Sequence, residues 1–133
     1  MGLTVEDLAG RYHQAWADRD PEATAALHSD ASVFHMHGVA AEAVGRTAVS
    51  ALITTLLRLV PDLAFALTRG YVADDHIVIE YDMSGTFDGS PFVCDGVDVL
   101  AVTDGEVARK DTYLDLTALV DQVGPLPDLS AAP

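Results

Sequence analysis

The stretch FVCDGVDVLAVTDGEVARKDTYLDL, residues 92–116, decides the fold. It contains two runs rich in β-branched and alternating residues, joined by Thr103-Asp104-Gly105. An Asp-Gly pair between such runs is typical of a tight β-hairpin turn. A similar pair of runs, residues 63–72 and 76–87, comes directly before it. The sequence therefore predicts four strands in two hairpins over the second half of the chain.

The first half of the chain indicates helices with one further strand. Thr4 and Asp20 are typical residues before a helix, and Pro21 suits a first helical position. The expected elements are a helix from Val5, a helix from Pro21, a strand over 32–37, and helices over 47–59 and 117–124. This order predicts an α+β domain over residues 1–124, with helices on one face of a mixed, curled sheet. Residues 125–133 lack periodicity and are expected to form a flexible tail.

Composition limits the partners. The 133 residues, half of them hydrophobic, suffice for one core, and the net charge of −14 argues against nucleic acid and anionic membranes. The longest apolar run is too short to span a bilayer. The first ten residues lack the basic and apolar parts of a secretory signal, and Cys94 has no second cysteine to pair with. We therefore expect a cytoplasmic protein without a membrane anchor.

Two histidines stand out at the end of the first predicted strand. His35 and His37 are two residues apart, so on a strand they share a face, while Phe34 and Met36 share the other. An imidazole near neutral pH suits proton transfer beside a carbonyl group. The same spacing permits a metal site completed by a facing carboxylate. No fixed metal-binding framework accompanies the pair, so we expect no metal and no cofactor.

Several motifs carry a family resemblance over nearly the whole chain up to Gly124. They are YHQAWADRDPEATAALHSDASVFHMHG, GRTAV, SGTFDG and GVDVLAVTDGEVARKDTYLDLTALVDQVG. Together with the element order, they resemble the SnoaL-like branch of the NTF2-like superfamily. The resemblance implies a cone in which a curved sheet wraps around helices and a deep pocket. It also implies a homodimer formed through the outer face of the sheet.

Ketosteroid isomerases of this superfamily suggest three catalytic residues. By resemblance, Tyr12 and Asp98 match a tyrosine and a protonated aspartic acid that form an oxyanion hole. His35 matches the position of the base, where the isomerases have a carboxylate. Asp98 lies among small or apolar residues of its strand, which favours an enclosed position over a solvated one. A core tyrosine and a structural histidine are the alternatives for Tyr12 and His35.

Limonene-type epoxide hydrolases suggest further acids. Their paired carboxylates correspond by resemblance to Glu80, Asp82 and Asp111, but the arginine that holds them is absent here. The alternation of residues 79–83 favours apolar side chains inside and acids outside, whereas the resemblance favours acids inside. Asp111 has the same two alternatives. Asp82 and Asp111 are therefore secondary candidates for acid–base work.

The remaining candidates are pocket residues. We expect a substrate to contact the side chains Trp16, His37, Leu52, Leu56, Phe65 and Glu80. The expected function is cofactor-free acid–base chemistry of SnoaL-like type, a cyclisation, isomerisation or dehydration, on a small hydrophobic polyketide- or terpenoid-type carbonyl compound. The alternatives are a non-catalytic module that binds a hydrophobic ligand or dimerises, and an epoxide hydrolase of limonene type.

Overall fold

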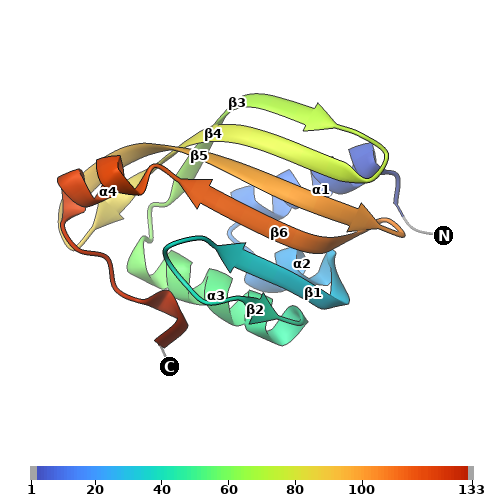
Figure 1. The fold of residues 1–133 in the computed structure, drawn as a ribbon, viewed down its shortest axis with the longest axis horizontal. Helices are drawn as coiled ribbons and strands as arrows, with labels where there is room; N and C mark the ends of the chain where they lie inside the picture. Colours follow the sequence, from blue (N-terminus) through green and yellow to red (C-terminus); the bar gives the residue numbers. More distant parts are fainter. Residues whose placement is uncertain (1–2, 132–133) are drawn as a thin grey trace.

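The computed structural model describes residues 3–131, which form an α+β fold with helices packed against a single sheet (Figure 1). Residues 1–2 and 132–133, the ends of the expected domain and tail, lie outside the described residues. The helices are α1 (Val5–Ala17), α2 (Pro21–Ala26), α3 (Arg46–Leu59) and α4 (Leu116–Val123), followed by a short 3₁₀ turn, η1 (Leu129–Ala131). The strands are β1 (His28–Met36), β2 (Ala43–Val44), β3 (Ala64–Val72), β4 (His76–Phe87), β5 (Ser90–Thr103) and β6 (Glu106–Leu114).

The six strands form one curled, open sheet in the order β2-β1-β6-β5-β4-β3. All neighbouring strands are antiparallel except β1 and β6, which run parallel although they lie far apart in the sequence. Helices α1, α2 and α3 lie on one side of the sheet, and α4 lies at one end of it (Figure 1). The curled sheet and these helices leave an interior between them, as the sequence predicts.

Local sequence signals explain where most elements begin and turn. The Thr4 side chain accepts a hydrogen bond from the Asp7 backbone N–H, and Asp20 caps α2 in the same way through Ala23. At the hairpin turn between β5 and β6, Asp104 and Gly105 both have positive φ, as a tight type I′ turn requires. These predicted starts and turns are confirmed.

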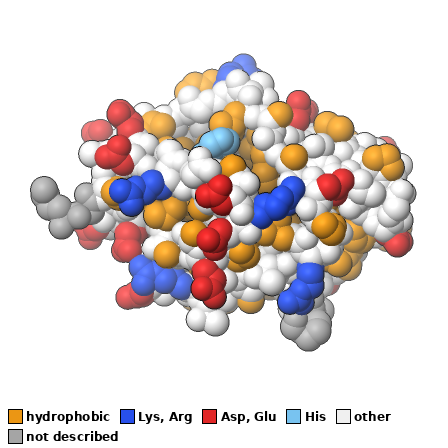
Figure 2. Space-filling model, turned by 180° about the vertical axis from the view of Figure 1, so that it is seen from behind, with side chains coloured by type: hydrophobic (Ala, Val, Ile, Leu, Met, Phe, Trp, Pro, Cys, Tyr) orange, Lys and Arg blue, Asp and Glu red, His pale blue; other side chains and the backbone are white. Residues whose placement is uncertain are grey.

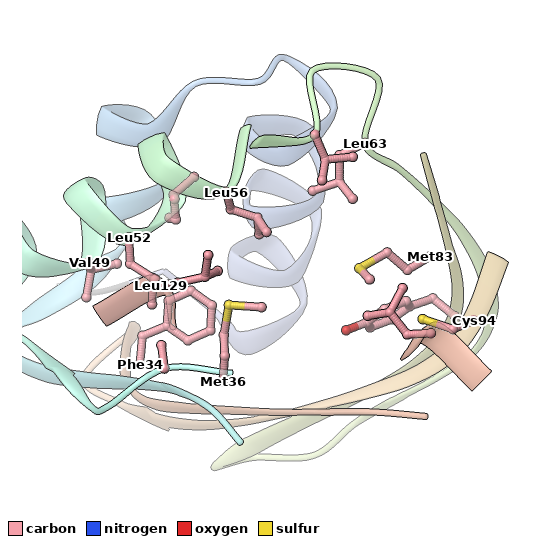
Figure 3. Close-up of a cluster of buried hydrophobic side chains, with 14 of the residues drawn as sticks. Phe34, Met36, Val49, Leu52, Leu56, Leu63, Met83, Cys94 and Leu129 are labelled. Atoms are coloured by element: carbon pink, nitrogen blue, oxygen red, sulfur yellow. The ribbon is translucent and has the colours of Figure 1, made fainter. Parts of the chain in front are cut away.

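The core lies between α3 and the inner face of the sheet. Phe34 and Met36 of β1 point toward Leu52 and Leu56 of α3, which lie opposite them (Figure 3). Phe34 is 1% exposed, and fully burying a side chain of this size contributes about 2–3 kcal/mol. Because β1 alternates its faces, the burial of Phe34 and Met36 fixes His35 on the outer face.

Two features differ from the sequence-based expectation. The short strand β2 pairs with β1 within a segment expected to be a loop. Residues 125–131, expected to belong to a flexible tail, pack against the domain, because Leu129 is buried in the core and Leu126 packs beside it. Within residues 3–131, no helix combines the length and apolar character needed to cross a membrane.

Candidate functional site

A cavity of about 200 Å³ opens between α1 and the inner face of the sheet. Helix α1 contributes residues 9, 12, 13 and 16, because residues three and four apart share one helix face. The sheet and α3 contribute Phe34, Met36, Leu56, Phe65, Leu67, Gly70, Val72, Ile77, Ile79, Tyr81, Met83, Asp98, Lys110 and Thr112. On the face seen in Figure 2, hydrophobic side chains gather near the centre between scattered charged ones. Most of the cavity lining is apolar, so its few polar groups define the chemistry.

Asp98 of β5 is the acceptor at the centre of these polar groups. Its Oδ1 accepts hydrogen bonds from the Tyr81 hydroxyl at 2.8 Å and the Thr112 hydroxyl at 2.7 Å. Its Oδ2 faces the ammonium of Lys110 at 3.4 Å. Strand register explains the cluster, because Asp98 pairs with Thr112 across the β5–β6 ladder and Lys110 precedes Thr112 by two residues.

Lys110 is buried in an aromatic environment. Its Nζ lies 4.6–4.9 Å from the ring centroids of Trp16, Phe34 and Tyr12. Such cation–π contacts stabilise an ammonium group most strongly when it is desolvated. Burial is the largest single effect and works against the charged form, but the Asp98 carboxylate and the Tyr12 hydroxyl together outweigh it, so the pKa of Lys110 lies above its ordinary value. The cavity therefore contains a positive charge held by one carboxylate and three rings.

Tyr12 connects the cavity to a buried histidine. Its hydroxyl lies 2.9 Å from Nε2 of His28, a residue with no exposed surface. Burial, followed by the positive charges of Lys110 and Arg46, lowers the pKa of His28 to about 3, so this imidazole is neutral near pH 7. Burial also raises the pKa of Tyr12, which keeps its hydroxyl protonated.

The environment of His28 indicates its tautomer. Within residues 3–131, its Nδ1 is buried without a hydrogen-bond partner. A buried N–H group without a partner is rarer in proteins than a buried acceptor without one. Nδ1 is therefore the unprotonated nitrogen, and the proton belongs on Nε2. His28 then donates to the Tyr12 oxygen, and the Tyr12 proton is left free to point into the cavity.

The His35–His37 pair lies on the other side of the sheet from this cavity. The two rings lie tilted against each other with centroids 3.8 Å apart, and the His37 ring stacks on Tyr113 at 4.2 Å. His37 Nε2 lies 2.8 Å from Oδ1 of Asp111, which also binds Arg109. Asp111 precedes Thr112 on β6, so it faces outward where Thr112 faces Asp98.

The expectation that His35 shares a hollow with Asp98 is therefore wrong. The alternation of β1 allows either face to be buried, and the larger apolar surface of Phe34 and Met36 takes the interior. His35 and His37 consequently do not line the cavity. The isomerase-like base position is not filled by His35 in this chain.

The acids implied by the epoxide hydrolase resemblance also lie outside. Glu80 pairs with Arg69 on the outer side of β3 and β4, and Asp82 is exposed. Asp111 is held by His37 and Arg109 on the same outer side. The apolar alternative for residues 79–83 is thus the observed one, and no epoxide-opening carboxylate pair enters the cavity formed by the described residues.

The other expected pocket residues are mostly in place. Tyr12, Asp98, Trp16, Leu56 and Phe65 all line the cavity. Leu52 is an exception, because it is buried in the core beside Phe34 and does not reach the cavity wall. The catalytic roles of Tyr12 and Asp98 stay predictions.

Comparison with known proteins identifies the family. Residues 9–110 match the SnoaL-like domain. The chain belongs to the SnoaL-like family. A comparison with curated protein sequences finds no match.

Solved structures similar to this SnoaL-like domain support the fold. A hypothetical protein with a ketosteroid isomerase-like fold from Catenulispora acidiphila, in complex with trimethylamine, is 23% identical with a TM-score of 0.81, covering 98% of this chain and 100% of its own. A putative SnoaL-like polyketide cyclase from Jannaschia is 15% identical with a TM-score of 0.77, covering 96% and 98%. A putative polyketide cyclase from Sinorhizobium meliloti is 20% identical with a TM-score of 0.68, covering 80% and 94%.

Sequence reasoning about this SnoaL-like domain missed Lys110, Thr112, Tyr81 and His28. Two signals point to Lys110: it is the only lysine in the chain, and it alternates with Asp111, so only one of the two faces the interior. No sequence signal points to His28 as the partner of Tyr12, because the two residues meet only through the packing of α1 over β1.

Proposed function

We propose that the cavity binds a small, mainly apolar molecule with a carbonyl oxygen and catalyses cofactor-free acid–base chemistry on it. Cyclisation, isomerisation and dehydration of such a compound all develop negative charge on that oxygen. The observation that supports this proposal is the Lys110 side chain, 4% exposed, at a mostly apolar cavity. A purely apolar binding module has no need to bury its only lysine beside a carboxylate.

In the proposed mechanism, Lys110 and Tyr12 stabilise the enolate oxygen. Lys110 has N–H groups beyond the one facing Asp98, and the Tyr12 proton is free when His28 donates to its oxygen. Each preorganised donor of this kind is worth about 3–4 kcal/mol of transition-state stabilisation. The apolar walls exclude water and strengthen these interactions.

Asp98 receives a different role from the one implied by the isomerase resemblance. Two hydroxyls donate to its Oδ1 and an ammonium faces its Oδ2, so its lone pairs are directed to protein groups. We assign Asp98 the positioning of Lys110, in place of donation to the substrate oxygen. Tyr81 and Thr112 hold Asp98 in turn.

We propose His13 as the group that accepts the substrate proton. Among the described residues, it is the histidine that lines the cavity, and it follows Tyr12 on α1. Its side chain is exposed, which places it at the mouth, where a proton taken from substrate passes to water. An imidazole is well matched to abstracting a proton beside a carbonyl group.

The proposal is tested with 2-naphthol, an apolar phenol whose ionisation is followed by absorbance and fluorescence. If Lys110 and Tyr12 stabilise oxyanions, the bound naphthol has a lower pKa than naphthol in water. The shift is expected to shrink in Tyr12→Phe and to shrink further in the double variant Lys110→Met/Asp98→Asn, which keeps the Tyr12 donor and leaves no unpaired charge. Arg58→Met, which removes an exposed cation of α3, serves as the control.

Two results would overturn the proposal. Naphthol that binds in the cavity with an unchanged pKa indicates a passive binding module instead. A shift as large in the double variant as in the unmodified chain indicates that Lys110 does not contribute to it. Trimethylammonium serves as a cationic comparison probe. Because the three rings already surround the ammonium of Lys110, we expect trimethylammonium to bind more weakly than naphthol.

The homodimer and the cytoplasmic location stay predictions. Val93, Val99 and Tyr113 are exposed on the outer face of β5 and β6, where the resemblance implies an interface. Sedimentation velocity over a range of concentrations tests the dimer. A Val99→Glu variant that remains folded but dissociates assigns the interface to this face.

A further inference from the structure

We propose that the outer face of the sheet binds a divalent transition-metal ion, with Zn²⁺ as the best match, through His35, His37 and Asp111. This outer-face triad is separate from the cavity and takes no part in the proposed reaction. Two imidazoles and one carboxylate are ligands that zinc accepts in proteins. Three protein ligands leave one position for water or another small ligand.

The strand register brings the three side chains together. His35 pairs directly with Asp111 across the parallel β1–β6 ladder, and His37 follows His35 on the same face. One ligand atom from each residue lies within 4.8 Å of the others. Ligand atoms around one zinc ion are about 3.4 Å apart, so side-chain rotations suffice to close the site without moving the strands.

One contact of the triad already has the arrangement that a metal would use. His37 Nε2 and Asp111 Oδ1 are 2.8 Å apart, with a proton between them. A zinc ion that binds both groups replaces this shared proton, since ligands must be deprotonated to bind metal. When the His37 ring is neutral, its Nε2 proton moves to Nδ1 as zinc binds, and when the ring is an imidazolium one proton is released to water.

Neighbouring residues supply the outer support that metal ligands usually have. Arg109 donates from Nε to Oδ2 of Asp111 at 2.8 Å and from Nη2 to Oδ1 at 2.9 Å, and thereby fixes the carboxylate. The charge of Arg109 is balanced by a second acid, Glu42, at 3.0 Å. Tyr113 stacks on His37 at 4.2 Å and limits the orientation of its ring. The net charge of −14 further favours cation binding.

Isothermal titration of the full chain with ZnCl₂, after treatment with a chelator, tests the proposal. We expect one ion per chain, and a loss of roughly tenfold or more in affinity in each of His35→Ala, His37→Ala and Asp111→Asn. His76→Ala is the matched control. His76 Nδ1 lies 2.8 Å from Asp75, which makes a second exposed His–Asp pair, one with no neighbouring histidine in the part of the chain described.

Co²⁺ provides a second readout, because its visible absorption reports the number and type of ligands. A spectrum of a four-coordinate ion that is lost in His35→Ala supports the triad. Far-UV circular dichroism of the metal-free variants checks that they are folded. The proposal is overturned if His35→Ala/His37→Ala binds zinc as tightly as the unmodified chain, or if His76→Ala causes the same loss. Naphthol binding in the cavity is expected to be unaffected by zinc.

Discussion

The Nζ of Lys110 lies 3.4 Å from Oδ2 of Asp98, and both side chains are almost entirely buried, at 4% and 12% exposure. The two residues come from neighbouring strands, β6 and β5. Removing one member of a buried pair leaves the other charge without compensation, whereas replacing both often has little cost. The pair therefore gives a sharp test of how the cavity is held together.

The first prediction concerns this pair. Lys110→Met is expected to lower the free energy of unfolding by about 3–5 kcal/mol, because Asp98 loses its counter-charge in an apolar site. Lys110→Met/Asp98→Asn is expected to recover most of that loss. Urea unfolding at pH 7 measures both, and Arg58→Met, at an exposed position, is expected to change stability by no more than about 0.5 kcal/mol. Additive losses in the double variant would contradict the coupling.

The second prediction concerns His28 and pH. The folded chain holds this histidine neutral down to about pH 3, whereas an unfolded chain protonates it near 6.5. Between these values the unfolded state binds the extra proton, so stability falls as pH falls, by about 2 kcal/mol from pH 7 to pH 5. His28→Gln removes this contribution.

Urea unfolding at pH 7 and pH 5 checks the His28 prediction. Relative to the unmodified chain, His28→Gln is expected to gain about 2 kcal/mol on acidification. The exposed His76 provides the control substitution, His76→Gln. An identical pH dependence in His28→Gln and the unmodified chain would show that the folded protein takes up a proton at His28.

The third prediction concerns the tautomer of His28. Nitrogen-15 spectra of histidine-labelled protein near pH 7 are expected to place the proton on Nε2, because Nδ1 is buried without a partner among the described residues. The signal of Nε2 is expected to change in Tyr12→Phe, which removes the oxygen 2.9 Å away. A proton found on Nδ1 would remove Tyr12 from the proposed oxyanion site.

The fourth prediction compares two glycines. A Cβ at Gly96 would lie 2.6 Å from Cε1 of Tyr81 and 2.9 Å from Cδ2 of Leu114. Gly96→Ala is expected to cost about 1–3 kcal/mol, because Tyr81 is buried and its hydroxyl holds Asp98. Gly10→Ala, in α1 with no atom within 4 Å, is expected to stabilise the chain by about 0.5–1 kcal/mol. Thermal unfolding of both variants measures this difference in stability. A loss of stability in Gly10→Ala would contradict the prediction.

The sequence predicts the elements well because their signals are local. Caps at Thr4 and Asp20 and the Asp104-Gly105 turn each depend on residues within a few positions. These signals, with the family resemblance, suffice for the cone and for the order of the helices and strands apart from the short strand β2. Caps and turns do not say which strand face turns inward, and over residues 79–83 the alternation and the resemblance favour opposite faces.

The site is harder to predict because its contacts join distant segments. Alternation divides β1 into two faces, but packing against α3 selects Phe34 over His35 for the interior. The same uncertainty applies to β6, where the sequence does not say whether Lys110 or its neighbour Asp111 faces the interior. His28 of β1 contacts Tyr12 of α1, and Leu129, which follows α4 in the sequence, packs in the core. The placements of His28 and Leu129 follow from tertiary packing that no local pattern contains.

The parallel contact of β1 with β6 also affects how the protein is made. His37 and its partner Asp111 are separated by 74 residues, so a chain growing on the ribosome finishes β1 long before β6 exists. Until then, the inner side chains of β1 and its open edge lack their main neighbour, a state that favours aggregation. Assembly of the sheet centre and of the cavity is therefore a late event in biosynthesis, and nascent chains stalled before β6 are expected to depend on chaperones.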